Sequence, residues 1–97
     1  MLPEATSQFQ VRPVEKSQVP AYARIEEAVR GIDGQTVIAG VLEDQGVRSF
    51  IFRLKRGERE CQVEFGKDQL RDSKTEQGWK QQEGGVLSKL RSAIRYQ

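Results

Sequence analysis

Three stretches in the middle of the chain alternate between apolar and polar residues, as strands with one buried face do. The apolar positions are Val37, Ala39 and Val41 in the first stretch, Phe50, Phe52 and Leu54 in the second, and Cys61, Val63 and Phe65 in the third. The opposite face carries Ile38, Leu42 and Ile51 among polar residues, so we expect it to be mostly solvated. The pattern predicts three antiparallel strands that share one apolar face.

The turns between these stretches predict how the strands pair. A two-residue turn at Gly57-Glu58, with glycine first as a type II′ turn requires, places position 54 opposite 61, 52 opposite 63 and 50 opposite 65. On the other face the same register pairs Lys55 with Glu60. For the earlier turn we place Gln45-Gly46 at the centre. This register sets Glu43 opposite Arg48, Val41 opposite Phe50 and Ala39 opposite Phe52.

Apolar residues three and four apart predict a helix on each side of the strands. The first covers residues 19–32, with Pro20 in its first turn and Gly31 as its C-terminal cap. The second is the segment VLSKLRSAIRYQ at the C-terminus. Residues 66–85 between strands and helix contain only Leu70 and Trp79 as large apolar side chains, which favours at most a short helix near 67–76 and then a mobile connection.

The pattern as a whole predicts an α+β fold in the order α-β-β-β-α. A three-stranded antiparallel meander has one apolar face, which the N-terminal and C-terminal helices cover, with a short extra helix near 67–76. Residues 1–18 form an extended N-terminal arm, and residues 19–97 form a single α+β domain. Phe9, Val11 and Val14 are candidate anchors of the arm onto the core; a frayed terminus is the alternative.

The composition excludes several classes of function. The 97-residue chain is 36% hydrophobic and 31% charged, has a net charge of +2, and contains no apolar run long enough to span a membrane and no signal-peptide pattern. It contains no histidine and one cysteine, Cys61, which falls on the apolar face of a strand. Without the commonest general base and metal ligand, we expect no enzyme activity, no metal and no cofactor, in a cytoplasmic protein that does not bind membranes.

Basic residues gather in two parts of the chain and suggest contacts to nucleic acid. Residues 46–59 hold five basic side chains against Glu58 alone, and residues 79–97 hold four against Glu83 alone. The candidate contacts are Arg48, Arg53, Lys55, Arg56, Arg59, Lys89, Arg91 and Arg95. The alternative is a solvated sheet face, because Glu60 and Glu64 share that face and no aromatic residue is there for stacking on bases.

Trp79 lies in the least apolar part of the chain. It is either a lid that folds back over the edge of the core or an exposed anchor for a protein partner. We therefore expect a small non-catalytic protein-interaction or regulatory module that uses the 66–85 segment or an open edge of the first or third strand. The alternative is a nucleic-acid-binding domain that uses the 48–59 hairpin and the C-terminal helix.

Overall fold

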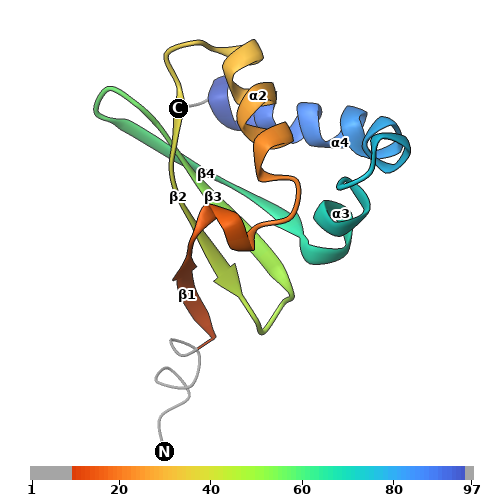
Figure 1. The fold of residues 1–97 in the computed structure, drawn as a ribbon. Coiled ribbons are helices and arrows are strands. Elements are labelled where there is room, and N and C mark those ends of the chain that lie inside the picture. Colours follow the sequence, from red (N-terminus) through yellow and green to blue (C-terminus); the bar gives the residue numbers. More distant parts are fainter. Residues whose placement is uncertain (1–9, 96–97) are drawn as a thin grey trace, which may run out of the picture.

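The α+β fold is confirmed by the computed structural model, which describes residues 10–95 (Figure 1). The elements follow in the order β1 (Val11–Val14), a 3-10 turn η1 (Lys16–Gln18), α2 (Tyr22–Ile32), β2 (Val37–Asp44), β3 (Ser49–Arg56), β4 (Arg59–Gly66), α3 (Lys67–Asp72) and α4 (Glu76–Arg95). The strands form one antiparallel sheet in the order β1-β2-β3-β4. The described helices pack on one face of it (Figure 1).

The core lies between this face and the helices. Its fully buried large side chains are Ile25 and Val29 of α2, Phe52 and Leu54 of β3, Phe65 of β4, Leu70 of α3, and Val86 and Leu90 of α4. At its centre Phe52 meets Phe65 edge to face, with ring centroids 5.6 Å apart. Edge-to-face contact is a favoured geometry of aromatic pairs, because the positive edge of one ring meets the negative face of the other.

The hairpin of β3 and β4 has the register that the sequence predicts. Leu54 lies opposite Cys61, Phe52 opposite Val63 and Phe50 opposite Phe65. At the turn Gly57 has a φ of +61°, and Glu58 has a negative φ. These are the φ signs of a type II′ turn, in which glycine takes the first central position without steric cost.

The predicted register of β2 against β3 is wrong by two residues. Val41 lies opposite Phe52 rather than Phe50, and Glu43 lies opposite Phe50 rather than Arg48. The loop contains residues 45–48 and not two central residues, because the Asp44 carboxylate accepts hydrogen bonds from the backbone of Gly46 and Val47 at 2.9 and 3.3 Å. A slip of two residues keeps every side chain on its own face, so the apolar alternation cannot detect it.

The predicted alternation is wrong for the first half of β2, because a β-bulge lies at Ala39. The register shifts between Ile38 and Gly40, so Ile38 packs against the core and Ala39 is exposed. Val37 moves to the opposite face, where 58% of it is exposed. An extra residue in one strand reverses the alternation that follows it, which explains why Val37 and Ala39 do not join Val41 in the core.

The sheet has four strands and not three, because residues 11–14 form β1. Val14 lies opposite Val41 and packs against the core, while Val11 lies opposite Asp44 and is 37% exposed. Two of the three candidate anchors therefore belong to a strand; Phe9 lies outside the described residues. β1 covers one edge of β2 from Val41 to Asp44.

The predicted start and end of the first helix need correction. Helix α2 begins at Tyr22, after Ala21 in the left-handed region at φ 60°, so Pro20 precedes the first turn. Gly31 is inside the helix, and the C-terminal cap is Asp33. The Asp33 side chain explains this end, because it accepts hydrogen bonds from the Gln35 backbone and the Thr36 hydroxyl, both at 3.0 Å.

The predicted mobile connection before the C-terminal helix is wrong, although the short helix near 67–76 is present as α3. Residues 76–95 form one helix of 20 residues, so α4 begins about ten residues earlier than predicted. The Thr75 hydroxyl caps its start by accepting a hydrogen bond from the Gly78 backbone at 3.0 Å. Contacts remote in sequence hold this first half: Trp79 packs against the core and Gln69 bonds to Gln82.

Candidate functional site

The first candidate site is the face of the sheet opposite the helices, here called the open face. In the observed register its apolar residues are Val11 and Pro13 of β1, Val37 and Leu42 of β2, and Ile51 of β3. Pro13, Leu42 and Ile51 are register partners across three strands and make one apolar row. None of the helices within residues 10–95 covers this row (Figure 1).

The other half of the open face is charged. Arg53 of β3 forms an ion pair with Glu60 of β4 at 2.8 Å, and the Ser49 hydroxyl donates a hydrogen bond to Glu64. Lys55, which the sequence analysis pairs with Glu60, is its register partner. The diagonal Arg53 makes the ion pair with that carboxylate. The open face is thus apolar at Pro13, Leu42 and Ile51, carries Asp44 beside Val11 at one end, and is charged with both signs toward β4.

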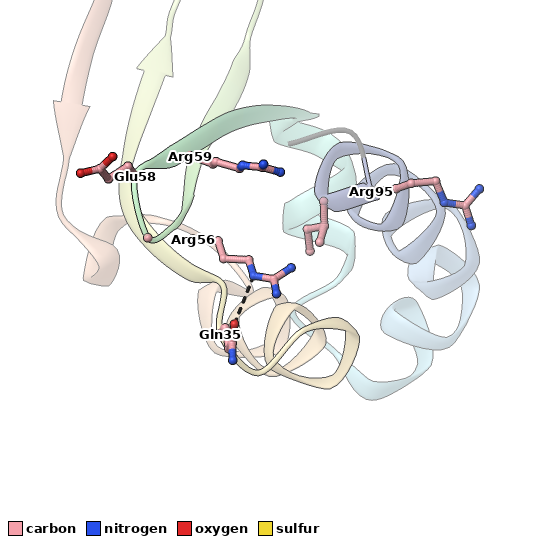
Figure 2. Close-up of a pocket in the computed structure, with 7 residues that line it drawn as sticks. Gln35, Arg56, Glu58, Arg59 and Arg95 are labelled. Atoms are coloured by element: carbon pink, nitrogen blue, oxygen red, sulfur yellow. Dashed lines mark hydrogen bonds between the residues drawn. The ribbon is translucent and has the colours of Figure 1, made fainter.

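The second candidate site is a hollow of about 650 Å³ at the tip of the β3–β4 hairpin, here called the arginine hollow (Figure 2). It is lined by Gln35, Arg56, Gly57, Glu58, Arg59, Ile94 and Arg95. Figure 2 shows Arg56 and Arg59 extending from the hairpin toward α4, whereas Glu58 points away from the hollow and Arg95 points outward from the last turn of α4. The hollow thus brings together three arginines from two distant parts of the sequence.

The turn between α2 and β2 holds Arg56 in place. One guanidinium nitrogen of Arg56 lies 3.2 Å from the Asp33 carboxylate, and its Nε donates a hydrogen bond to the Gln35 side chain at 3.3 Å. Hydrogen bonding from the Gln35 backbone lowers the pKa of Asp33 below its usual value, and the Thr36 hydroxyl and the charge of Arg56 add to the effect. Asp33 therefore stays ionised at neutral pH and keeps Arg56 oriented.

The eight basic residues predicted to contact nucleic acid lie in separate places. Arg56, Arg59, Arg91 and Arg95 lie at the end of the molecule with the hairpin tip, where Arg91 and Arg95 also line a smaller depression beside α2. Arg53 and Lys55 are on the open face, Arg48 is in the β2–β3 loop 4.0 Å from Asp68, and Lys89 donates to the backbone of Glu64. They do not form one continuous basic surface.

The structure agrees with one of the two alternatives for Trp79 and covers part of one predicted strand edge. Trp79 is half-buried against the core, with the Arg24 guanidinium 5.8 Å from its ring centroid, which agrees with a lid. The edge of the first predicted strand is covered by β1 from Val41 to Asp44. β4 is the strand at the other edge of the sheet. The Lys89 ammonium group donates a hydrogen bond to the backbone carbonyl of Glu64 in this strand at 3.0 Å.

Comparison of the chain with protein-family models, curated proteins and solved structures finds no match. Among residues 10–95 no cluster of three or more acidic, cysteine or histidine side chains is placed to hold a metal ion. No helix in the same range is long and apolar enough to cross a membrane. The two candidate sites are therefore the basis for inferring the function.

The sequence analysis missed several residues of both sites. Leu42 and Ile51 were expected on the open face, but the predicted register set Leu42 opposite Ser49, so their pairing follows only from the observed register. Pro13 joins them only because the arm becomes a strand. Gln35 and Asp33 next to the arginines carry no signal of their own, because their contact with Arg56 spans more than 20 residues of sequence.

Proposed function

We propose that this protein is a non-catalytic protein-interaction module of the cytoplasm, that the open face of its sheet is the docking surface, and that a second copy of the chain occupies it. The observation that carries the proposal is the apolar row of exposed Pro13 and half-buried Leu42 and Ile51, on a face that none of the helices within residues 10–95 covers. Exposed apolar surface next to charged residues is typical of protein interfaces.

Apolar burial is the driving force that this face offers. Two of the large apolar side chains that are exposed lie on it: Val11 next to Pro13 of the row, and Val37 at the other end of β2, opposite Lys55. Each buried CH₂ group contributes about 0.8 kcal/mol when it leaves water. A partner that covers the row therefore gains stability at the centre of the face, while the charged half stays at the rim.

The distribution of charge favours a second copy over a strongly acidic or basic partner. Arg53 and Lys55 lie beside Glu60 and Glu64, so the face carries both signs and no large net charge. A two-fold axis can place the cations of one copy opposite the carboxylates of the other and the apolar rows together, as in an isologous dimer with packed sheets.

The size of the face sets the expected strength. Four strands of up to eight residues, spaced ~4.8 Å apart with a rise of ~3.4 Å per residue, cover roughly 500 Å². This footprint is below the ~800 Å² per partner of a standard interface. We therefore expect a reversible dimer with a dissociation constant of roughly 1 μM or weaker.

Sedimentation equilibrium of the wild type and of Leu42→Glu tests this proposal. We expect the wild type to show a concentration-dependent mass between one and two chains. A carboxylate in the apolar row loses its hydration in the dimer, so Leu42→Glu should weaken association at least tenfold, which is about 1.4 kcal/mol.

The matched control is Val47→Glu. Val47 is 64% exposed in the β2–β3 loop, the largest exposed fraction among the large apolar side chains of residues 10–95, and it lies outside the strands. If non-specific hydrophobic contact drives association, Val47→Glu weakens it as much as Leu42→Glu does, and the proposal fails. A wild type that stays monomeric up to about 1 mM also overturns it.

A further inference from the structure

The proposed function does not involve the arginine hollow. It lies on the helix side of the sheet, because Arg56 and Arg59 are register partners that continue the side of Leu54 and Cys61. Its volume of about 650 Å³ is within the ~300–1,000 Å³ of small-molecule sites. Its described lining contains three arginines and a single carboxylate, Glu58, which points away (Figure 2).

We propose that the arginine hollow binds the phosphate group of a small phosphorylated molecule. A guanidinium group presents its N–H donors in a planar fork that matches two phosphate oxygens, and such charge-assisted hydrogen bonds are about twice as strong as neutral ones. Arg56 and Arg59 extend into the same space from opposite sides of a two-residue turn. They are therefore placed to bind one phosphate group together.

The contacts of Arg56 prepare it for this role. Its ion pair with Asp33 at 3.2 Å and its hydrogen bond to Gln35 at 3.3 Å restrict a side chain that would otherwise be mobile. A side chain that is already ordered loses less conformational entropy when a ligand binds. Asp33 is not among the residues that line the hollow, and its ion pair uses Nη1 of Arg56.

A small ligand fits the hollow better than a nucleic-acid strand does. A strand needs a track of cations along its backbone, and aromatic side chains on which bases stack. No aromatic residue is among the described residues of the lining, and other basic residues such as Arg48 and Arg53 face elsewhere beside Asp68 and Glu60. The cations at this end therefore suit a compact anion.

Titration of the full-length protein with inorganic pyrophosphate, followed by amide and arginine Nε chemical shifts in NMR spectra, tests the proposal. We expect saturable shifts at Gly57, Glu58 and Ile94 and at the Nε of Arg56 and Arg59. Arg59→Gln should weaken binding about tenfold or more, because it removes one charged fork. Arg59→Lys should restore only part of the affinity, since an ammonium group keeps the charge and loses the planar geometry.

The matched control is Arg71→Gln, which removes another exposed arginine, one of α3 that pairs with Asp68 and does not line the hollow. An equal loss of affinity in this control means that binding is diffuse and overturns the proposal, as does the absence of saturable shifts with pyrophosphate. The last titration uses a single-stranded DNA of about ten nucleotides without terminal phosphates as the ligand. If it binds more tightly than pyrophosphate, a nucleic-acid strand and not a small ligand is the occupant.

Discussion

At the scale of single residues, the Glu43 carboxylate makes the free energy of unfolding depend on pH. Its carboxylate accepts hydrogen bonds from Lys67 at 2.6 Å and from Arg12 at 3.0 Å, and the side chain is 13% exposed. The Lys67 hydrogen bond is the largest cause that lowers the pKa of Glu43 below its ordinary 4.5; the Arg12 hydrogen bond and both charges lower it further. The folded state therefore holds this proton less tightly than the unfolded state does.

This depressed pKa predicts how Glu43→Gln behaves. A carboxylate with a lower pKa in the folded state stabilises the fold above its unfolded pKa and loses that contribution as pH falls through the folded value. At pH 7 we expect Glu43→Gln to lower the free energy of unfolding by about 1–2 kcal/mol, because two charge-assisted hydrogen bonds are weakened. Urea unfolding at several pH values should show this difference shrinking as pH falls below 4.5. A difference that stays constant down to pH 2 contradicts the prediction.

At the scale of elements, the sequence predicts a strand pair well when a short turn and an apolar alternation agree. The β3–β4 hairpin is such a case, since Gly57 fits only one position of the turn. The β2–β3 pair is not, because the loop depends on the Asp44 side chain and on Arg48 in the left-handed region at φ 55°. The bulge at Ala39 lies next to Gly40, and a glycine inside a strand is a signal of a bulge that the prediction did not use.

The first half of α4 was not predicted as a helix, for another reason. Its sequence is poor in apolar residues, and Gly78, Gly84 and Gly85 each lower the intrinsic preference for a helix. The capping Thr75 and the contact of Trp79 with the core stabilise the helix from outside the segment. Local sequence patterns do not contain such tertiary contacts. For the same reason, the sequence identified the basic residues but could not show that Arg56, Arg59 and Arg95 line one hollow.

A pair of glycine variants tests whether α4 is continuous. Gly84 is exposed inside the helix, with no atom within 4 Å of an added Cβ, so Gly84→Ala should stabilise the protein by about 0.5–1 kcal/mol. At Gly78 an added Cβ overlaps the Asp72 carbonyl oxygen, so Gly78→Ala should destabilise by roughly 1–3 kcal/mol. Thermal unfolding measures both changes. Two neutral variants would show that residues 78–85 are a connection and not a helix.

At the scale of the whole molecule, the two proposed sites use opposite sides of one sheet. Strand residues alternate between the faces, so Arg56 continues the helix side of Leu54, whereas Ile51 and Leu42 point to the open face. The helices cover the side with the hollow and leave the other side available (Figure 1). One small domain can therefore dimerise through one face and bind a ligand at the end of the other.

This arrangement predicts that the two binding events are independent. Coupling between sites requires an element that changes state when either ligand binds, and the described residues of the open face and of the hollow share no side chain. We expect Leu42→Glu to leave the dissociation constant for pyrophosphate unchanged within about twofold, and Arg59→Gln to leave the dimer constant equally unchanged. The double variant should then lose both activities by the amounts that the single variants show.

Sedimentation and NMR titration of the same four proteins measure all of these constants. If Leu42→Glu alone weakens pyrophosphate binding about tenfold, the second copy contributes to the hollow and the sites are coupled. In that case the dimer cannot be the face-to-face arrangement proposed above, because the open face and the hairpin tip point in different directions. The same measurement would then assign the second copy to the hairpin end, beside Arg59 and Arg95.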